Sequence, residues 1–207
     1  EAATRMIAPY VEAGNIVILE STSPVGTTED IVAGILKDAG HDIDKDVYVA
    51  HCPERVLPGR ILTELVENDR IVGGVNKAAT EKAVEFYNTF VRGEVLVTDS
   101  RTAEMAKLTE NAFRDVNIAF VNELAKISDV LELDVVDIID GMGTKPFGKG
   151  PFYPGVGVGG HCIAVDPEWL SAASRRAGYM PEMIQLARNV NNSMPEYTAA
   201  ILQDMLN

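Results

Sequence analysis

The sequence lacks the features that mark several classes of protein. It has two cysteines in 207 residues, Cys52 and Cys162, too few for the disulfide framework of a secreted domain. A reducing cytoplasm is therefore the expected compartment. No apolar run approaches the roughly 18 residues of a membrane span, and no basic and apolar signal segment opens the chain. Secreted and membrane-spanning proteins are thus not expected.

Positive charge is also scarce. Lys and Arg number 18 against 31 Asp and Glu, which gives a formal net charge of −13. Phosphate backbones are bound by basic surfaces, so nucleic acid is not an expected partner. An anionic small molecule would have to be met by a local basic pocket.

Over the first hundred residues, short apolar runs alternate with helical patterns. The run Ile16–Leu19 has the continuous β-branched and apolar character of a strand buried on both faces. Such alternation predicts an α/β domain with a parallel sheet. Strands are expected at 16–19, 47–50, 70–72 and 95–97, and helices at 2–13, 28–39 and 78–91.

The second half has a helical pattern. No breaker occurs from Thr102 to Leu131, where apolar residues step by threes and fours, which predicts an amphipathic helix about 40 Å long at ~1.5 Å per residue. A short helix at 135–141, a loop rich in Gly and Pro at 143–160 and helices at 167–177 and 181–206 follow, the last interrupted at Pro195. We place a domain boundary near Ser100, so that 1–100 is α/β and 101–207 is all-helical.

The loop before Cys162 is the first candidate site. Four glycines at 155–160 let the backbone approach a ligand, and Cys162 is predicted to begin a helix. A helix N-terminus stabilises negative charge, and the thiolate is the nucleophilic form of cysteine. Asp166 lies one turn further on. A tight turn beside an inert, buried cysteine fits the same pattern.

Polar residues on the long helix form a second candidate site. Lys107, Asn111 and Arg114 are spaced by four and three residues and share one face. Lys107 can stabilise an oxyanion or carry a proton, and Asn111 can donate to the same oxygen. A solvated polar stripe is the alternative.

Two further segments follow predicted strands. Residues 20–28 are rich in hydroxyls, and such segments form ligand crevices in α/β sheets or simply cap a helix. Residues 51–59 include Glu54, a candidate acid or base, and Arg55, a candidate anion clamp. The pairs His51-Cys52 and His161-Cys162 suggest zinc, but adjacent side chains rarely bind one ion, so no metal site is expected.

Four segments together resemble the UDP-glucose/GDP-mannose dehydrogenase family. They are Ser-Thr-Ser-Pro-Val-Gly, Pro-Glu-Arg, Ala-Lys-Leu-x-x-Asn-Ala-Phe-Arg and Gly-Gly-His-Cys followed by Asp-Pro, at 21–26, 53–55, 106–114 and 159–167. They occur in the family's order and cover most of the chain. The resemblance implies the rear part of a Rossmann-like NAD domain (1–100) and a central helical domain (101–207) that dimerises through its long helix.

The same resemblance implies an activity and a role for each residue. A UDP-sugar would be oxidised at C6 from alcohol to carboxylate by two hydride transfers to NAD, through a thiohemiacetal and a thioester on Cys162. Lys107 and Asn111 would stabilise the oxyanion, and Asp166 and Glu54 would manage water and protons. Substrate would contact Arg55, Val56, Arg114 and Gly159, and the cofactor would contact Thr22.

The resemblance also bears on the sugar. The segments around His51 and Cys162 are most similar to members acting on UDP-N-acetyl-D-mannosamine, whereas residues 145–153 resemble members acting on the glucosamine or galactosamine analogues. UDP-glucose is a further alternative. A non-catalytic dimerising scaffold, or a thiol hydrolase using Cys162 with a histidine, belongs to another class.

The resemblance implies that the chain is a piece of a longer protein. Glu1 is not a methionine and enters a helical pattern at once. The family's opening strand–GxGxxG–helix unit and its closing UDP-binding domain would lie outside the piece, which is then expected to be inactive alone and to expose a sheet edge.

Overall fold

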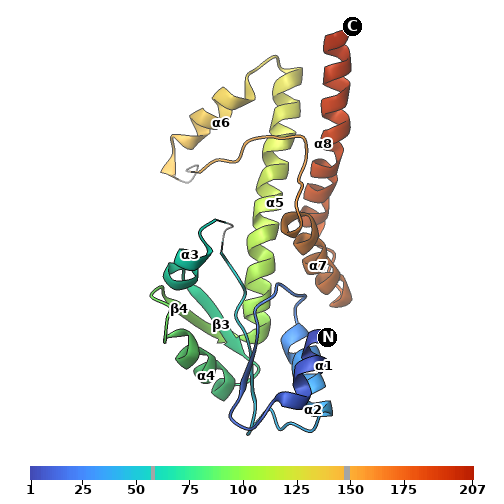
Figure 1. Cartoon of the computed structure of the whole chain (residues 1–207). Helices are drawn as coiled ribbons and strands as arrows, with labels where there is room; N and C mark the ends of the chain where they lie inside the picture. Colours follow the sequence, from blue (N-terminus) through green and yellow to red (C-terminus); the bar gives the residue numbers. More distant parts are fainter. Residues whose placement is uncertain (57–58, 147–149) are drawn as a thin grey trace. The chain divides into compact units, whose positions relative to one another are not determined.

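The structure, a computed structural model, describes residues 1–56, 59–146 and 150–207. It divides into two compact units, Glu1–Leu108 and Thr109–Asn207. The division falls inside a long helix, α5 (Ser100–Val130). The first unit contains a sheet with short helices, and the second is helical (Figure 1). The domain boundary near Ser100 stays a prediction.

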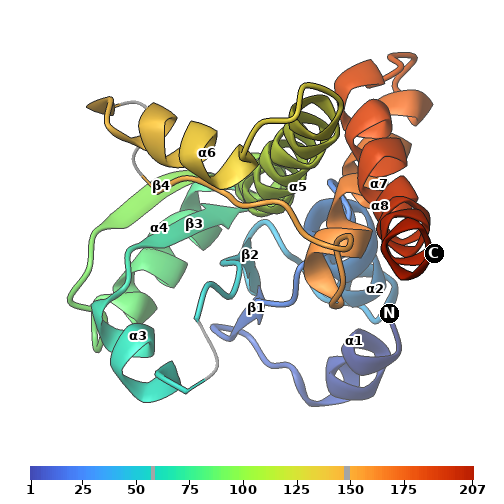
Figure 2. The same ribbon diagram turned by 90° about the horizontal axis from the view of Figure 1, so that it is seen from above.

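Within the described residues, a four-stranded sheet forms the centre of the first unit. Its strands lie in the order β1 (Ile16–Leu19), β2 (Tyr48–His51), β3 (Arg70–Gly74) and β4 (Val95–Asp99) (Figure 2). β1 and β2 are parallel, and so are β3 and β4. All four strands expected from the sequence are confirmed within a residue or two at their ends.

The prediction of a fully parallel sheet is wrong at one pair of strands. β3 runs antiparallel to β2, with Ala50 opposite Gly74. A parallel pair needs a crossover that returns the chain to the starting end of the first strand. Here the chain is still at the carboxyl end of β2 just before β3 begins. This is shown by the side-chain amide of Asn68, which donates to the Arg55 carbonyl at 3.4 Å. The sheet is therefore mixed.

Helices cover both faces of this sheet. Val49 and Ala50 are consecutive in β2 and so point to opposite faces. Val49 packs in a core with Leu36 of a helix after β1, and Ala50 packs in a second core with Tyr87 of the helix after β3. The helices of this unit are α1 (Ala2–Ile7), η1 (Ala8–Tyr10), the π-helical η2 (Thr27–Val32), α2 (Ala33–Asp38), α3 (Ile61–Glu67) and α4 (Lys77–Tyr87).

Glycine is required where β3 meets its neighbours. A Cβ on Gly73 would lie 2.1 Å from the carbonyl oxygen of Asp99, and one on Gly74 would lie 2.4 Å from the backbone nitrogen of Thr80. Backbone atoms cannot move aside as a flexible side chain can. These two glycines therefore allow β3 to approach the end of β4 and the first turn of α4.

The second unit is built from long helices. After α5 come α6 (Val135–Gly143), α7 (Cys162–Arg176) and α8 (Glu182–Leu206). Asp134 caps α6 by accepting from the backbone nitrogen of Val136 at 2.7 Å. Residues 150–161 contain no helix or strand, and 147–149 of the predicted loop lie outside the described residues. None of the described helices combines the length and apolarity needed to cross a membrane.

The expected long helix is confirmed, but its apolar stripe is only partly buried. Leu108 and Ala112 are buried as expected, whereas Phe120 is 55% exposed and Ile127 48% exposed. The buried face of α5 includes polar residues instead, among them Asn111, Asp115 and Asn122. The sequence pattern predicts the helix correctly but misassigns part of the face that packs.

The predicted interruption at Pro195 is wrong, because α8 continues through it. A proline inside a helix removes the N–H that would bond the carbonyl four residues earlier, here that of Asn191. The loop before α7 approaches that carbonyl, since a Cβ built on Gly157 would lie 3.3 Å from it. The freed carbonyl therefore faces another segment of the same unit. α8 itself continues to Leu206.

Candidate functional site

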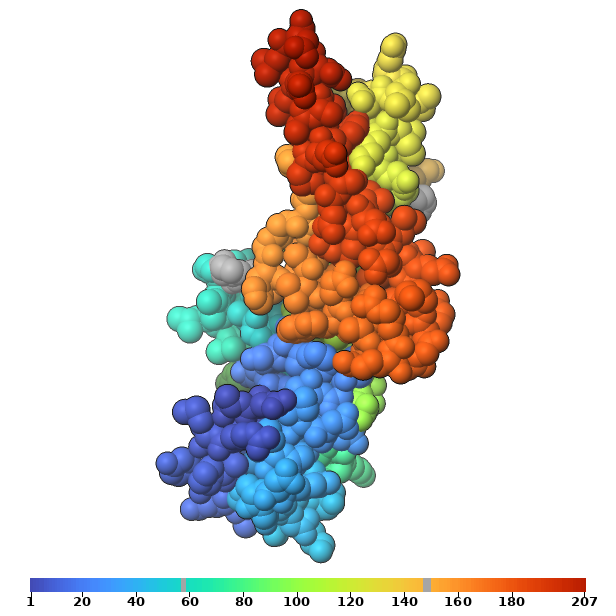
Figure 3. Space-filling view, turned by 90° about the vertical axis from the view of Figure 1, so that its right-hand side faces the viewer, coloured from blue at the N-terminus to red at the C-terminus, as the bar shows by residue number. Residues whose placement is uncertain are grey.

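Cys162 is the first residue of α7, as the sequence predicts, and its thiol is free and exposed. His161 precedes it as the N-cap residue and makes no side-chain capping hydrogen bond. The segment that leads into α7 lies against α8 (Figure 3). The alternative of a buried, inert thiol does not apply to Cys162.

Asp166 and Asn111 are joined by a buried hydrogen bond. Asn111 on α5 donates through Nδ2 to Oδ2 of Asp166 on α7 at 2.5 Å. Asp166 is 3% exposed and lies four residues after Cys162. The bond therefore fastens the first turn of α7, and with it the cysteine, to α5.

Lys107 and Arg114 lie on α5 on either side of Asn111. Lys107 is half-buried and one turn before Asn111, and Arg114 is exposed and nearly one turn after it. The predicted shared face of these three residues follows from their spacing in one continuous helix. The alternative of a fully solvated polar stripe does not hold for Asn111, which is 9% exposed.

Thr22 and Glu54 leave the sheet at neighbouring positions. They follow β1 and β2, and the backbone pairing of these strands continues past both ends. Cys52 N donates to Leu19 O at 3.1 Å, and Glu54 N donates to Glu20 O at 3.0 Å. Thr22 is half-buried and Glu54 is exposed. The carboxyl edge of parallel strands is where ligands bind in such sheets.

A local hydrogen bond between a side chain and the backbone orders the Pro-Glu-Arg segment. The Glu54 carboxylate accepts a short hydrogen bond from the Val56 nitrogen, and Arg55 and Val56 are half-buried. Residues 57–58 of the predicted candidate segment lie outside the described residues.

A polar cluster of buried Tyr87 and Arg70 with exposed Glu20 supports this edge, and the sequence did not reveal it. Tyr87 of α4 donates to Glu20 Oε1 at 2.6 Å, and the Arg70 guanidinium lies 5.8 Å from the centre of the Tyr87 ring. Burial, together with the hydrogen bond to Glu20, raises the pKa of Tyr87. Burial likewise raises the pKa of Cys52, so this thiol is unsuited to be a nucleophile.

The two histidines that precede cysteines have different surroundings. His51 is fully buried, and burial lowers its pKa to about 4, so its ring is neutral at pH 7. His161, by contrast, is exposed. Among the residues that the structure describes, no three His, Cys, Asp or Glu side chains gather closely enough to hold a metal ion.

Glu104 is a second residue that the sequence did not reveal. It is 1% exposed near the start of α5 and accepts three hydrogen bonds from the segment after β1. Their donors are Gly26 N at 2.5 Å, Thr28 N at 2.7 Å and Thr28 Oγ1 at 2.6 Å. Glu104 thereby takes the place of a capping side chain for η2, which has none of its own. The same segment carries Thr22.

The glycine loop before Cys162 has the spacing G-x-G-x-x-G but not the setting of a dinucleotide fingerprint. Residues 150–161 contain no strand, and the loop follows α6 rather than a strand. Gly157 and Gly160 have positive φ. Gly159 is exposed, with open space where a Cβ would stand.

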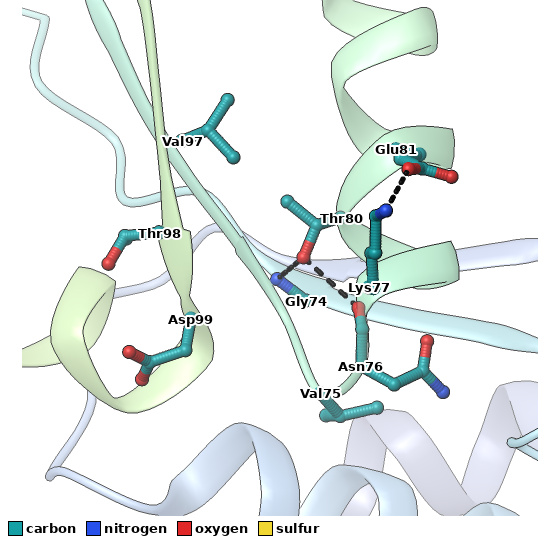
Figure 4. A pocket seen from close by; sticks show the side chains of 9 residues that line it. All are labelled: Gly74, Val75, Asn76, Lys77, Thr80, Glu81, Val97, Thr98 and Asp99. Atoms are coloured by element: carbon teal, nitrogen blue, oxygen red, sulfur yellow. Dashed lines mark hydrogen bonds and ion pairs between the residues drawn. The ribbon is translucent and has the colours of Figure 1, made fainter.

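A cavity of about 400 Å³ opens elsewhere in the first unit, at the carboxyl ends of β3 and β4 and the first turn of α4 (Figure 4). Asn76, Thr80 and Thr98 are among its lining residues. Thr80 is occupied, because its hydroxyl accepts from Gly74 N and donates to Asn76 O. No residue predicted from the sequence to bind or catalyse lines this cavity.

The fold and these segments match one family. Residues 1–91 match the UDP-glucose/GDP-mannose dehydrogenase family's NAD binding domain, and residues 101–193 match its central domain. The chain belongs to the UDP-glucose/GDP-mannose dehydrogenase family.

Named relatives are similar over nearly the whole chain. It is 48% identical to a UDP-N-acetyl-D-mannosamine dehydrogenase of Methanococcus aeolicus, over 97% of this chain and 44% of that protein. It is 49% identical to an NDP-N-acetyl-D-galactosaminuronic acid dehydrogenase of Ralstonia solanacearum, over 95% and 47%. A solved UDP-D-ManNAc dehydrogenase from Pyrococcus horikoshii superposes with a TM-score of 0.92 at 42% identity, over 99% and 48%. The chain thus spans about half the length of the curated relatives it matches.

Proposed function

We propose that the whole protein oxidises the C6 alcohol of a UDP-N-acetylhexosamine to a carboxylate, with NAD as the acceptor. The observation that carries this proposal is the arrangement on α7. An exposed thiol opens the helix, and one turn later Asp166 is hydrogen-bonded to Asn111 of α5. A nucleophile beside a buried polar pair suits covalent catalysis on a carbonyl. The family supplies the reaction class.

The covalent steps balance as follows. A base takes the C6 hydroxyl proton as a hydride leaves, which produces an aldehyde. The Cys162 thiolate forms a C–S bond to that carbon, and the oxygen takes a proton. Loss of a second hydride and a proton gives a thioester, and water then breaks the C–S bond. Per sugar, two hydrides leave, one water enters, three protons are released and the thiolate is regenerated.

The amide of Asn111 can serve both the protein and the substrate. An asparagine amide has two N–H donors, and one of them is used on Asp166. The other can donate to an oxyanion, and we assign the same role to Lys107, which can also carry the proton. Glu54 and Asp166 would activate the water and take its protons.

Substrate contacts are assigned by charge and position. Arg55 and Arg114 would neutralise the UDP phosphates, which the acidic chain as a whole cannot do. Val56 and Gly159 would contact the sugar nucleotide through their backbone, Gly159 because nothing occupies the space beside its Cα.

NAD would be held in part by the segment after β1. The residues there fit it, because Thr22 lies at the carboxyl edge of β1 and the hydroxyl of neighbouring Ser23 is buried with no hydrogen-bond partner. NAD, when bound, would supply the acceptor for the hydrides. The chain's contribution would be to orient it through these hydroxyls.

UDP-N-acetyl-D-mannosamine is the substrate we propose. The Methanococcus and Pyrococcus relatives are named for that sugar, and the Ralstonia relative for N-acetylgalactosaminuronic acid. The N-acetylglucosamine and N-acetylgalactosamine analogues, and then UDP-glucose, are the alternatives.

We further propose that the protein is a homodimer joined through α5. Phe113, Phe120 and Ile127 recur every seventh residue and are 64%, 55% and 48% exposed. Seven residues are two helical turns, so these side chains form one stripe along the helix. A stripe of this kind is costly to leave in water and suits a second copy of the same helix. Sedimentation of Phe120→Arg should give a monomer, and a dimer would contradict the assignment.

The activity is tested on the full-length protein, wild type and Cys162→Ala. Each is incubated with NAD and each of the three UDP-N-acetylhexosamines, and NADH absorbance is followed. We expect two NADH per sugar with one of them and no uronate from the variant. A wild type that forms no NADH with any UDP-sugar would leave the dimerising scaffold as the better hypothesis.

A further inference from the structure

A buried chain of hydrogen bonds in the second unit ends on the glycine loop. Asp115 of α5 accepts from Arg188 Nη1 at 2.8 Å and from Asn191 Nδ2 at 2.8 Å, both on α8. Asn191 Oδ1 accepts from Asn122 Nδ2 at 2.9 Å, and Asn122 Oδ1 accepts from the backbone nitrogen of Gly155 at 2.9 Å. The series therefore runs from an ion pair between two helices to one N–H of the loop.

The orientation of every group in this series is determined by its two ends. The Gly155 N–H can only donate, and a carboxylate can only accept. Asn122 must therefore point its oxygen at the loop and its nitrogen at Asn191, and Asn191 must do the same toward Asp115. Asn122, Asn191 and Asp115 are each at most 1% exposed. A buried network with one allowed orientation is rigid.

Helix packing alone does not call for such a network. A buried ion pair loses its hydration, and apolar residues of similar size often pack as well or better. Asp115 Oδ2 is buried with no hydrogen-bond partner, which adds to this cost. The series gives the unit something apolar packing cannot, namely a fixed acceptor for a loop N–H.

The loop is held at a second point two residues later. Gly157 has φ +133°, and a Cβ there would lie 3.3 Å from Asn191 O and 3.4 Å from the Pro195 ring. The loop thus rests on α8 at the carbonyl that Pro195 leaves without its helical partner. Both holding points lie just upstream of Cys162.

The segment around Cys162 is therefore fastened at both ends by amides of α5. Asn122 holds it upstream at Gly155, and Asn111 holds it downstream at Asp166. We propose that Asn122, supported by Asn191 and Asp115, is a positioning residue that fixes where the Cys162 thiol is presented. Its consequence for turnover rests on the proposed function, but its consequence for the thiol does not.

Loss of this positioning has a characteristic effect on the reaction. The thiolate must be close to the aldehyde carbon when the first oxidation ends. If the loop is released, the aldehyde dissociates before the C–S bond forms. Each sugar consumed then yields one NADH and an aldehyde rather than two NADH and a carboxylate. This ratio is independent of how much of the variant protein is folded.

The test uses the full-length protein with two variants that break the series at different places. Asn122→Ala removes the acceptor from the core, and Gly155→Pro removes the donor from the exposed loop, where folding is least at risk. Asn189→Ala, exposed on the same helix as Asn191, is the matched control. NADH and uronate per sugar consumed are measured, with hydroxylamine present to trap free aldehyde. Alkylation of Cys162 by iodoacetamide is followed by peptide mass spectrometry.

We expect NADH per sugar to fall from two toward one in both variants, uronate formation to fall at least tenfold and trapped aldehyde to accumulate. Cys162 should be alkylated at least threefold faster, while Asn189→Ala behaves as wild type. Two NADH per sugar in both variants would overturn the inference. If the wild type forms no NADH, the proposed function fails, and the labelling decides alone: equal rates in both variants and the control would then overturn the positioning role.

Discussion

The three hydrogen bonds accepted by Glu104 allow a stability prediction to be worked out from the structure. Glu104→Ala removes the acceptor of Gly26 N, Thr28 N and Thr28 Oγ1, all buried. The hydroxyl can rotate to another acceptor, but the two backbone donors cannot. A buried donor without a partner costs about 1–3 kcal/mol. We therefore expect Glu104→Ala to lower the free energy of unfolding by about 4 kcal/mol.

Glu104→Gln should fall between the wild type and the alanine variant. Oε1 already accepts both bonds from Thr28, and a glutamine oxygen can keep that role. The amide nitrogen would then face the Gly26 N–H, donor against donor. One backbone bond is lost, so the expected cost is about 2 kcal/mol.

Urea unfolding followed by circular dichroism measures both variants. The matched control is Glu81→Ala, which removes an exposed ion pair with Lys77 at 3.6 Å. Pairs of this kind contribute about 0–1 kcal/mol. A loss below 1 kcal/mol for Glu104→Ala, or equal losses for Glu104→Ala and Glu81→Ala, would refute the reasoning.

Two further predictions concern the first unit. Because burial holds the pKa of His51 at about 4, below its ordinary 6.5, the unfolded chain binds a proton between these pH values that the folded chain does not. Stability is therefore lost as pH falls from 6.5 toward 4, by about 2 kcal/mol at pH 5 relative to pH 8. This loss should vanish in His51→Leu when urea unfolding is compared at the two pH values. An unchanged pH dependence in the variant would contradict the prediction. Gly73→Ala should cost about 3 kcal/mol, because its Cβ would overlap the Asp99 carbonyl, whereas Gly34→Ala in α2, with nothing within 4 Å, should stabilise by about 0.5–1 kcal/mol. Thermal unfolding of the two variants checks the opposite signs, and two shifts of the same sign would count against the close approach at Gly73.

The sequence predicts helices and strands well where the pattern depends only on residues within that one helix or strand. The run Ile16–Leu19 and the unbroken helical stretch from Thr102 to Leu131 needed only local periodicity, and both are confirmed. α3 was missed because seven residues with an exposed Ile61 and Leu62 show no clear periodicity.

Strand direction, and what surrounds Pro195, involve contacts between distant segments. The direction of β3 follows from where the connection after β2 ends, which local pattern does not encode. Likewise, the general rule that proline interrupts a helix takes no account of the loop that lies against the freed Asn191 carbonyl. Sequence reasoning could predict these helices and strands but not the contacts between them and distant segments.

Several other buried polar residues could not be predicted from the sequence, although Asn111 and Asp166 were. Asp115 and Arg188 are 73 residues apart in the chain, and Thr28 and Glu104 are 76 apart. Asp115, Arg188 and Glu104 would each be assigned to the surface from their chemistry alone, because charged residues are rarely buried unless paired. Only the fold brings their partners together.

These polar residues change how the long helix is understood. Its sequence predicts an apolar stripe beside a polar face, and that polar face was expected to carry a candidate site or, as the alternative, to meet solvent. In the structure, three polar residues on separate turns of that helix instead hold three other segments. Glu104 holds the turn after β1, Asn111 holds α7, and Asn122 holds the glycine loop. Apolar positions 113, 120 and 127 are among those left exposed. α5 therefore uses several polar residues to hold other segments of its own chain while part of its apolar stripe stays exposed, which is the reverse of what the amphipathic pattern suggests for those positions.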